Sequence, residues 1–313
     1  MTRVVSLGSI NVDRVRTVEA AELEALEARD GWFPGPGETV TVEELPGEWP
    51  APDRIRHGGK GANQAIAARA AGADTTLLGK VGHDHEEFGV LEALREAAVD
   101  VSAVGIAAVP TGTAEVFVDP DGENRITISS GANDAIDTAY IDEQYDIILA
   151  ADCLLLQNEV PVEPVAELLD RLREEPDRPT VVLDPAPAEG VDPLLGYDAV
   201  DYLTPNEHEY ATIGDALAEF DGIVIHKRGG DTVTVEGDTP VDEAIPPEVD
   251  AVDTTGAGDV LSGFLAAGLA AGDEFSEALD IAVIAGSLST TTPGAREGIP
   301  TLEELRRFRA ADG

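Results

Sequence analysis

The chain has 313 residues, of which 62 are Asp or Glu and only 20 are Lys or Arg, so its formal net charge is −42. Its length can bury a large core, and 43% hydrophobic against 26% charged residues excludes an intrinsically disordered chain. The net charge repels nucleic acids and anionic membrane surfaces, and we expect neither as a partner.

Acidic residues are spread along the whole chain and do not form a discrete tail. This distribution is typical of a surface adapted to high salt, where at about 1 M the screening length falls to roughly 3 Å. We therefore expect a halophilic protein whose activity and stability need salt. The single Cys153 excludes an intrachain disulfide, and the sequence shows neither a signal-peptide pattern nor a membrane-spanning run, so we expect a cytoplasmic location.

Short β-branched runs alternate with alanine-rich amphipathic stretches over most of the chain. In chain order we predict a strand at 4–7, a helix at 62–71, a strand at 75–78, a helix at 87–98, a strand at 147–156, a helix at 162–174, and strands at 181–183 and 223–225. This alternation predicts a mainly parallel sheet covered by helices, with ligands bound beyond the carboxyl ends of its strands.

Two regions interrupt the alternation. Residues 113–118 and 125–129 flank a turn rich in Asp and Gly, which predicts a β-hairpin that could cover a site. Residues 14–55 combine an acidic helical patch at 20–28 with a segment dense in Pro and Gly and a strand at 38–42. We interpret this region as a lid.

The segment Asp253-Thr254-Thr255-Gly256-Ala257-Gly258-Asp259 leads directly into an apolar run at 260–265. Its small residues let backbone N–H groups converge, and a helix starting there adds the positive end of its dipole, so the segment is suited to bind an anion. A carboxylate there repels the anion unless it has another task, and Asp259 could accept a proton from a nucleophile beside a bound phosphate. The alternative is a plain helix start with Asp259 as a first-turn charge.

Two further segments are suited to a ligand rich in hydroxyl groups. The glycine-rich run at 56–64 opens a helix, permits close approach to the backbone, and offers Asn63 as donor and acceptor, although it could be a plain turn. Asn11 and Asp13 follow a strand two residues apart, so both side chains can point the same way, although either could instead cap a turn.

Asn206 and Glu209 lie three apart at a predicted helix start, where their oxygens could hold the waters of a magnesium ion. A capping box made by Glu209 is the structural alternative. His83 and His85 lack a third partner and make a weak metal motif. The sequence contains neither a Walker-type phosphate loop nor a dinucleotide fingerprint after a strand, so the anion site has another design.

The segments at 58–65 and 253–259 resemble the two signatures of the ribokinase-like (PfkB) carbohydrate kinase family. Ordered matches between and around them agree, at 7–11, 36–40, 131–133, 184–188, 204–207 and 294–295. The resemblance covers nearly all of the chain and is greatest to the ribokinase branch. It implies a three-layer α/β/α fold with a mainly parallel central sheet and a small β lid. The implied segments are a core start at 1–13, a lid segment with insertions at 14–55, core at 56–112, a lid hairpin at 113–130, and core with the nucleotide site at 131–313.

The resemblance also implies an ATP-dependent transfer of phosphate to a primary hydroxyl, with D-ribose to D-ribose 5-phosphate as the first choice. Asp259 would be the base, and the amides of Gly256, Ala257 and Gly258 would hold the charge of the transferring group. The residues implied to contact the sugar are Asn11, Asp13, Gly59, Lys60, Asn63, Glu159 and Asp259.

The cofactors implied are ATP, Mg²⁺ and a monovalent K⁺ activator. Asn206 and Glu209 would organise Mg²⁺ through water. The residues implied to line the nucleotide pocket are Asn206, Lys227, Gly229, Gly256 and Gly258. Those implied to form the K⁺ site are Asp253, Thr255, Ser289, Thr292, Gly294 and Gly298.

The chain departs from the family pattern at Lys227, where the family has a threonine facing the phosphates, and in acidic insertions at 20–33 and 47–55. These insertions flank the implied sugar pocket and the lid, through which the resemblance implies a homodimer. Fructose, a 2-keto-3-deoxy sugar acid or a nucleoside therefore remain alternative acceptors; a sugar acid would need an arginine, for which only Arg56 is at hand. Alternatives of another class are a non-catalytic sugar-binding protein and a nucleoside hydrolase.

Overall fold

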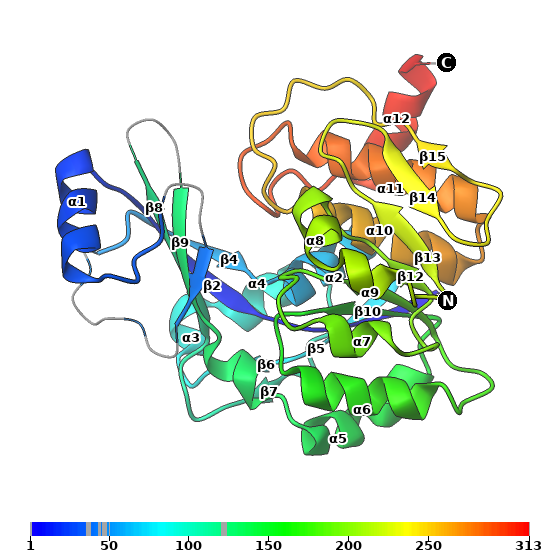
Figure 1. The fold of residues 1–313 in the computed structure, drawn as a ribbon, viewed down its shortest axis with the longest axis horizontal. Coiled ribbons are helices and arrows are strands. Elements are labelled where there is room, and N and C mark those ends of the chain that lie inside the picture. Colours follow the sequence, from blue (N-terminus) through cyan, green and yellow to red (C-terminus); the bar gives the residue numbers. More distant parts are fainter. Residues whose placement is uncertain are drawn as a thin grey trace.

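The computed structural model describes residues 2–35, 39–42, 45, 49, 51–119 and 124–312. Its centre is a sheet of eight strands in the order β15-β14-β13-β12-β11-β10-β1-β5 (Figure 1). The strands are β1 (Arg3–Leu7), β5 (Asp74–Leu78), β10 (Cys153–Gln157), β11 (Thr180–Asp184), β12 (Tyr202–Leu203), β13 (Ile223–His226), β14 (Val233–Glu236) and β15 (Glu243–Ala244). All neighbours pair in parallel except β13 with β14 and β14 with β15.

Successive side chains of the central strands enter two separate cores, because strand residues alternate between the faces of a sheet. Leu154 and Leu156 of β10 belong to one core, and Cys153 and Leu155 to the other. Helices α5 (Thr138–Leu149), α6 (Val162–Leu172) and α7 (Asp192–Leu195) cover the first face, and α2 (Lys60–Ala70), α10 (Ala257–Ala271), α11 (Phe275–Ser289) and α12 (Leu302–Asp312) cover the second. The predicted three-layer fold is confirmed.

A second sheet of five strands stands to one side of the core, in the order β3-β9-β8-β2-β4 (Figure 1). Its strands are β2 (Asn11–Thr17), β3 (Thr39–Thr41), β4 (Arg54–Gly58), β8 (Gly112–Val118) and β9 (Asn124–Ser129). Helix α1 (Ala20–Arg29) packs on this sheet through Leu23 and Leu26, which share a cluster with Phe33 and Phe117. We call this sheet with α1 the lid.

The remaining elements connect these parts. They are β6 (Lys80–Val81) paired with β7 (Gly105–Ile106), α3 (His85–Phe88), α4 (Val90–Glu96), the 3₁₀ turn η1 (Gly131–Ala135), α8 (Glu207–Thr212) and α9 (Gly214–Leu217). No helix in the described part of the chain is long and apolar enough to cross a bilayer.

Two predicted elements need correction. The strand predicted at 147–156 begins only at Cys153, because Ile147 to Leu149 form the last turn of α5. The spacing of the buried residues fits the observed helix, because Ile141 and Ile148 are seven residues apart and face the core together. The helix predicted at 87–98 is two helices, since Gly89 adopts a left-handed φ of 63° between α3 and α4.

The predicted hairpin is confirmed by the antiparallel pairing of β8 with β9, and the acidic patch at 20–28 is the helix α1. The strand predicted at 38–42 corresponds to β3 over Thr39–Thr41. Three parts of the sequence prediction lie outside the described residues. They are residues 36–38 of the family match at 36–40, the hairpin turn at 120–123, and residues 47, 48 and 50 of the second insertion.

Candidate active site

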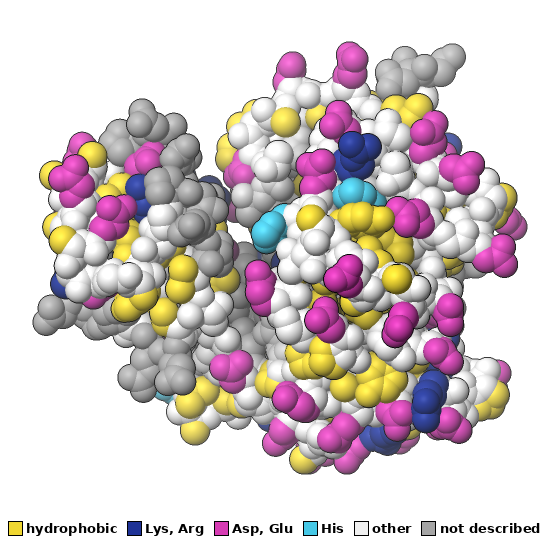
Figure 2. Space-filling model, viewed as in Figure 1, with side chains coloured by type: hydrophobic (Ala, Val, Ile, Leu, Met, Phe, Trp, Pro, Cys, Tyr) yellow, Lys and Arg dark blue, Asp and Glu magenta, His cyan; other side chains and the backbone are white. Residues whose placement is uncertain are grey.

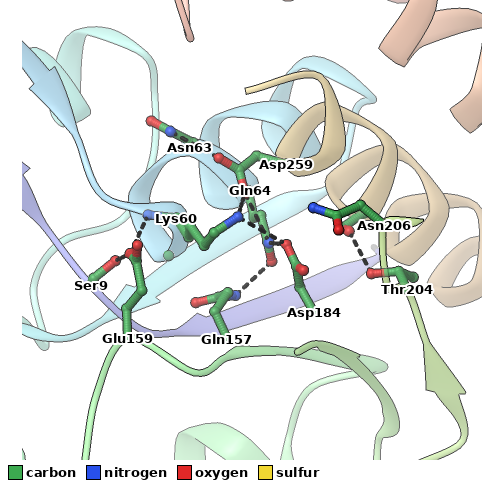
Figure 3. Close-up of polar contacts among 12 residues, drawn as sticks. Ser9, Lys60, Asn63, Gln64, Gln157, Glu159, Asp184, Thr204, Asn206 and Asp259 are labelled. Atoms are coloured by element: carbon green, nitrogen blue, oxygen red, sulfur yellow. Dashed lines mark hydrogen bonds and ion pairs between the residues drawn. The ribbon is translucent and has the colours of Figure 1, made fainter. Parts of the chain in front are cut away.

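The predicted site residues come from elements that meet at the carboxyl ends of the central strands, where Lys60 opens α2 and Asp259 lies in the first turn of α10 (Figure 3). Helices α2 and α10 pack closely because Gly263 has no side chain: a Cβ there would lie 2.6 Å from the carbonyl oxygen of Gln64. This close approach brings side chains of α2 next to Asp259.

Asp259 is 4% exposed and is surrounded by donors. Asn63 Nδ2 donates to Oδ2 at 3.0 Å, and Gln64 Nε2 donates to Oδ1 at 3.2 Å. The ammonium group of Lys60 lies 3.6 Å from Oδ1. A carboxylate with donors on both oxygens is fixed in one orientation, as a positioned general base must be.

Asp184, at the end of β11, is fully buried between two lysines. Lys60 Nζ lies 3.4 Å from its Oδ2 and Lys227 Nζ lies 3.5 Å from its Oδ1. Burial acts to raise the pKa of Asp184, but Lys227 and Lys60 prevail and hold it below its usual value. Burial acts to lower the pKa of Lys60, and the surrounding carboxylates, Asp184 first among them, raise it well above its usual value. Lys60 is therefore a cation at neutral pH.

The predicted acceptor residues line the junction between the core and the lid. Asp13 on β2 packs over Gly58, where a Cβ would lie 2.4 Å from the carboxylate oxygens. Burial raises the pKa of Asp13 to about 6, against the opposing charge of Arg296. Asn11, two residues earlier on β2, accepts a hydrogen bond from Asn133 Nδ2 at 2.7 Å.

Glu159 joins the same region from beyond the end of β10. Its carboxylate accepts hydrogen bonds from the Ser9 hydroxyl and, at 3.1 Å, from the backbone N–H of Lys60 (Figure 3). Burial raises the pKa of Glu159. Gly59, with a φ of 90°, lies against the backbone of Ser9, and a Cβ at this position would be 2.6 Å from the Ser9 carbonyl oxygen.

The predicted anion hole is the start of α10. Gly256 has a left-handed φ of 78° and packs against Ala295, whose carbonyl oxygen would be 2.8 Å from a Cβ. The N–H of Ala257 donates to Thr254 at 3.2 Å, whereas a helix offers no internal acceptor to the N–H groups of its second and third residues, here Gly258 and Asp259. A Cβ on Gly258 would lie 3.0 Å from Lys227 Nζ, so this cation stands beside those N–H groups.

A cavity of about 870 Å³ opens from this point, within the range of small-molecule sites. All five residues predicted to line the nucleotide pocket border it: Asn206, Lys227, Gly229, Gly256 and Gly258. Its apolar wall consists of Val233, Pro246, Pro247, Val249, Ala251, Leu261 and Val283. The cavity thus has a cationic, amide-rich end beside Asp259 and an apolar part suited to a flat ring system.

Asn206 and Glu209 form a capping box at the start of α8. Glu209 accepts from the Asn206 backbone N–H and side-chain amide, both at 2.7 Å, and its own N–H donates to Asn206 Oδ1 at 2.9 Å. The capping box expected as the structural alternative for this pair is therefore present. Burial and the nearby Asp184 raise the pKa of Glu209. The Glu209 carboxylate and the Asn206 amide oxygen, both at the edge of the cavity, are also donor types that Mg²⁺ prefers.

The residues of the expected K⁺ site come from the segment before α10 and from the end of α11 with the loop that follows it, and these segments lie together. Asp253 accepts from the N–H of Thr255 at 3.0 Å and from the N–H of Gly294 at 2.8 Å. Gly298 packs on Ser289, whose carbonyl oxygen would be 2.1 Å from a Cβ, and Thr292 lies in the loop between them. Within the described ranges, no group of three or more His, Cys, Asp or Glu residues is placed to hold a metal, and His85 instead contacts the carbonyl of Gly82 at 2.9 Å.

Four residues of this network carried no role in the sequence prediction: Gln64, Gln157, Asp184 and Arg296. Asp184 could have been found, because it is a polar residue at the carboxyl end of a buried strand. Gln64 lies one turn after Lys60 and faces the same way. Gln157 and Arg296 gave no local signal, since each acts on a side chain from a distant segment.

Comparison with known proteins gives consistent results. Residues 52–302 match the pfkB family of carbohydrate kinases. Ribokinase of Bacillus subtilis is 37% identical over 260 residues, which cover 80% of this chain and 87% of that protein. The structure of Thermotoga maritima ribokinase superposes with a TM-score of 0.78 at 29% identity and 99% coverage of both chains. The structure of Arabidopsis thaliana ribokinase complexed with ribose and ATP gives a TM-score of 0.74 at 28% identity, with 98% and 97% coverage.

Proposed function

The chain belongs to the pfkB family of carbohydrate kinases, and on that premise we propose that it transfers the γ-phosphoryl group of ATP to the primary hydroxyl of D-ribose, forming D-ribose 5-phosphate and ADP. The observation that carries the proposal is Asp259: a buried carboxylate fixed by donors from α2, at the start of a helix that borders a nucleotide-sized cavity. The A. thaliana relative, whose structure contains ribose and ATP, supports both substrates.

In this mechanism Asp259 accepts the proton of the primary hydroxyl as the sugar oxygen attacks the γ-phosphorus. The bond from that phosphorus to the bridging oxygen breaks, and ADP leaves with the electron pair. Negative charge on the transferring group faces the N–H groups at the start of α10 and the ammonium of Lys227. Phosphoryl transfer depends mainly on such positioning and charge stabilisation.

Acceptor binding is assigned to the junction of lid and core. Asp13 and Asn11, on one face of β2, offer a carboxylate and an amide to adjacent hydroxyls. Asn63 and Lys60 approach from the start of α2, and Glu159 with Gly59 completes the pocket. The carboxyl ends of the strands and the lid thus enclose the sugar beside Asp259.

Mg²⁺ and K⁺ belong to the same proposal. Asn206 and Glu209 offer oxygens that could hold the waters of Mg²⁺, which would neutralise phosphate charge when bound. Asp253, with the carbonyls of Ser289, Gly294 and Gly298, would hold K⁺ near the start of α10. Two rate measurements test these assignments: one replaces K⁺ by Na⁺, and the other replaces Mg²⁺ by Ca²⁺.

A sugar acid is the main rival acceptor, because Arg296 adds a cation that the sequence prediction did not place in the pocket. Burial lowers the pKa of Arg296 to about 10, and the carboxylates of Asp13 and Asp259 act in the opposite direction. These two carboxylates offset the charge of the guanidinium. The balance favours a neutral acceptor. ADP release measured with ribose, fructose, 2-keto-3-deoxygluconate and adenosine tests the choice; no rate with ribose would refute it.

We further propose that the enzyme works in a salt-rich cytoplasm, as a homodimer joined through the lid. Figure 2 shows acidic side chains scattered over the visible face of the core. At about 1 M salt their repulsion is screened within roughly 3 Å. Thermal unfolding at rising KCl should show increasing stability, and maximal stability in salt-free buffer would contradict this adaptation. Sedimentation at high KCl tests the dimer.

A further inference from the structure

Arg296 reaches the acceptor side of the site from the loop between α11 and α12. Its Nε donates to Asn63 Oδ1 at 2.7 Å, and its Nη2 donates to the carbonyl oxygen of Gly58 at 2.7 Å. The side chain is partly buried. Because the guanidinium is a rigid planar fork, these two bonds fix the group between the C-terminal loop and the start of α2.

The chemistry of its partners determines how the Asn63 amide is oriented. An amide has one accepting oxygen and one donating nitrogen, whereas arginine only donates and an ionised carboxylate only accepts. With Oδ1 toward Arg296 and Nδ2 toward Asp259, both ends of Asn63 are satisfied. The reversed amide would set two donors against each other on one side and two acceptors on the other.

Gln64 shows the same arrangement on the other oxygen of Asp259. Its Nε2 donates to Asp259 at 3.2 Å and to Asp184 at 3.0 Å, while its Oε1 accepts from Gln157 Nε2 at 2.6 Å (Figure 3). Each oxygen of the base therefore receives an amide whose far end is held by a dedicated donor. Gln157 holds one amide and Arg296 holds the other.

We propose that Arg296 is a positioning residue of the phosphoryl-transfer site: its guanidinium orients the Asn63 amide and, through it, the Asp259 carboxylate. This inference rests on the proposed function, in which Asp259 is the base. Arg296 touches neither reacting atom in this arrangement. Both hydrogen bonds of its guanidinium go to the protein, and carboxylates of Asp13 and Asp259 face its charge.

The test is a double-mutant cycle in kcat, with the acceptor on which the wild-type enzyme is fastest. Arg296→Met should lower kcat by about 10- to 100-fold, the range expected when a reacting group is misplaced by an ångström. Asn63→Ala should lower it comparably. If Arg296 acts through Asn63, the double variant should match Asn63→Ala within about twofold, because the two changes remove one interaction.

Three results would overturn the proposal. A kcat for Arg296→Met within twofold of wild type would remove the role. Losses that multiply in the double variant would show that Arg296 acts independently of Asn63. A higher acceptor KM with unchanged kcat would make Arg296 a direct acceptor ligand instead.

Arg178→Met is the matched control, because Arg178 makes two hydrogen bonds to Asp201, at 2.7 and 2.8 Å, away from the site. Its kcat should equal that of the wild type. If Arg296→Met does not fold, Arg296→Lys replaces it in the cycle: the charge remains but the fork is lost, so a smaller, equally non-additive loss is expected. The activity of the wild-type protein tests the proposed function, whereas the variants test the role of Arg296. A failure of one proposal is therefore distinguishable from a failure of the other.

Discussion

The acceptor and donor sides of the site are built differently. On the acceptor side, Asn63, Gln64 and Arg296 form a continuous hydrogen-bond network around Asp259 made of the chain's own side chains. On the donor side a cavity of about 870 Å³ is bordered by Lys227, and Glu209 bonds to the cap of its own helix. The protein thus positions Asp259, the proposed base, by itself, whereas the donor side offers charges and space that the nucleotide and a cation would organise.

Asp259→Asn removes the base while keeping the shape of the acceptor side, and it should have the largest effect. We expect kcat to fall by about 10²- to 10⁴-fold or more, since an amide cannot accept the hydroxyl proton. Calorimetry should show retained acceptor binding. Asp273→Asn, just beyond the other end of α10, is the control and should leave kcat unchanged. Full activity in Asp259→Asn would show that the acceptor side holds no required base, and would contradict the contrast drawn between the two sides.

The two lysines beside Asp184 test the comparison, because Lys60 also lies 3.6 Å from Asp259 and Lys227 stands beside Gly258 at the start of α10. Lys60→Met should raise the acceptor KM, and Lys227→Met should raise the ATP KM, each by about 10- to 100-fold, as expected when a charged hydrogen-bonding group is lost. Steady-state kinetics with one substrate saturating separates the two. If both variants changed the same KM, the division of the site would be wrong.

The pH dependence of acceptor binding is a smaller test of the acceptor side. Burial raises the pKa of Asp13 to about 6, and Arg296, Glu159 and Arg56 are the charged groups that face it. In the proposed acceptor site the ionised carboxylate accepts hydrogen bonds from the sugar hydroxyls, so the acceptor KM should rise as the pH falls through about 6, by up to tenfold per unit. Asp13→Asn should bind the acceptor weakly, with a KM that does not change with pH. A pH-dependent KM in that variant would show that another group titrates.

Glu209→Gln gives the smallest expected effect and separates a cap from a cation site. Glutamine also completes a capping box, so α8 should keep its stability. If Glu209 helps to hold Mg²⁺, the concentration of Mg²⁺ for half-maximal rate should rise by about three- to tenfold. An unchanged Mg²⁺ requirement would leave Glu209 with its structural role alone.

The sequence predicted the core better than its boundaries. Largely buried strands such as β11 and the helices between them follow from hydrophobic runs and spacing. The strand at 147–156 was misplaced because an apolar helix end runs into an apolar strand with only a short turn at Ala150 to Asp152 between them. Gly89 divides a helix through its backbone conformation, which periodicity does not reveal.

The candidate site was predictable where it lies in contiguous motifs, as at Asp259 and Asn63. The residues that hold those two in place were not, because Arg296 and Gln157 are far from their partners in sequence. Local patterns report local structure, whereas a positioning contact across the fold exists only after the sheet and helices have packed. The roles of the individual residues stay predictions until the variants are measured.

The most direct test of the central claim is ³¹P NMR of the wild-type protein with ATP, Mg²⁺ and D-ribose in concentrated KCl. We predict that ADP and D-ribose 5-phosphate accumulate in equal amounts, because the proposed mechanism brings the primary hydroxyl to Asp259. Phosphate on another ribose hydroxyl, or no ribose phosphate while another acceptor is consumed, would contradict the account.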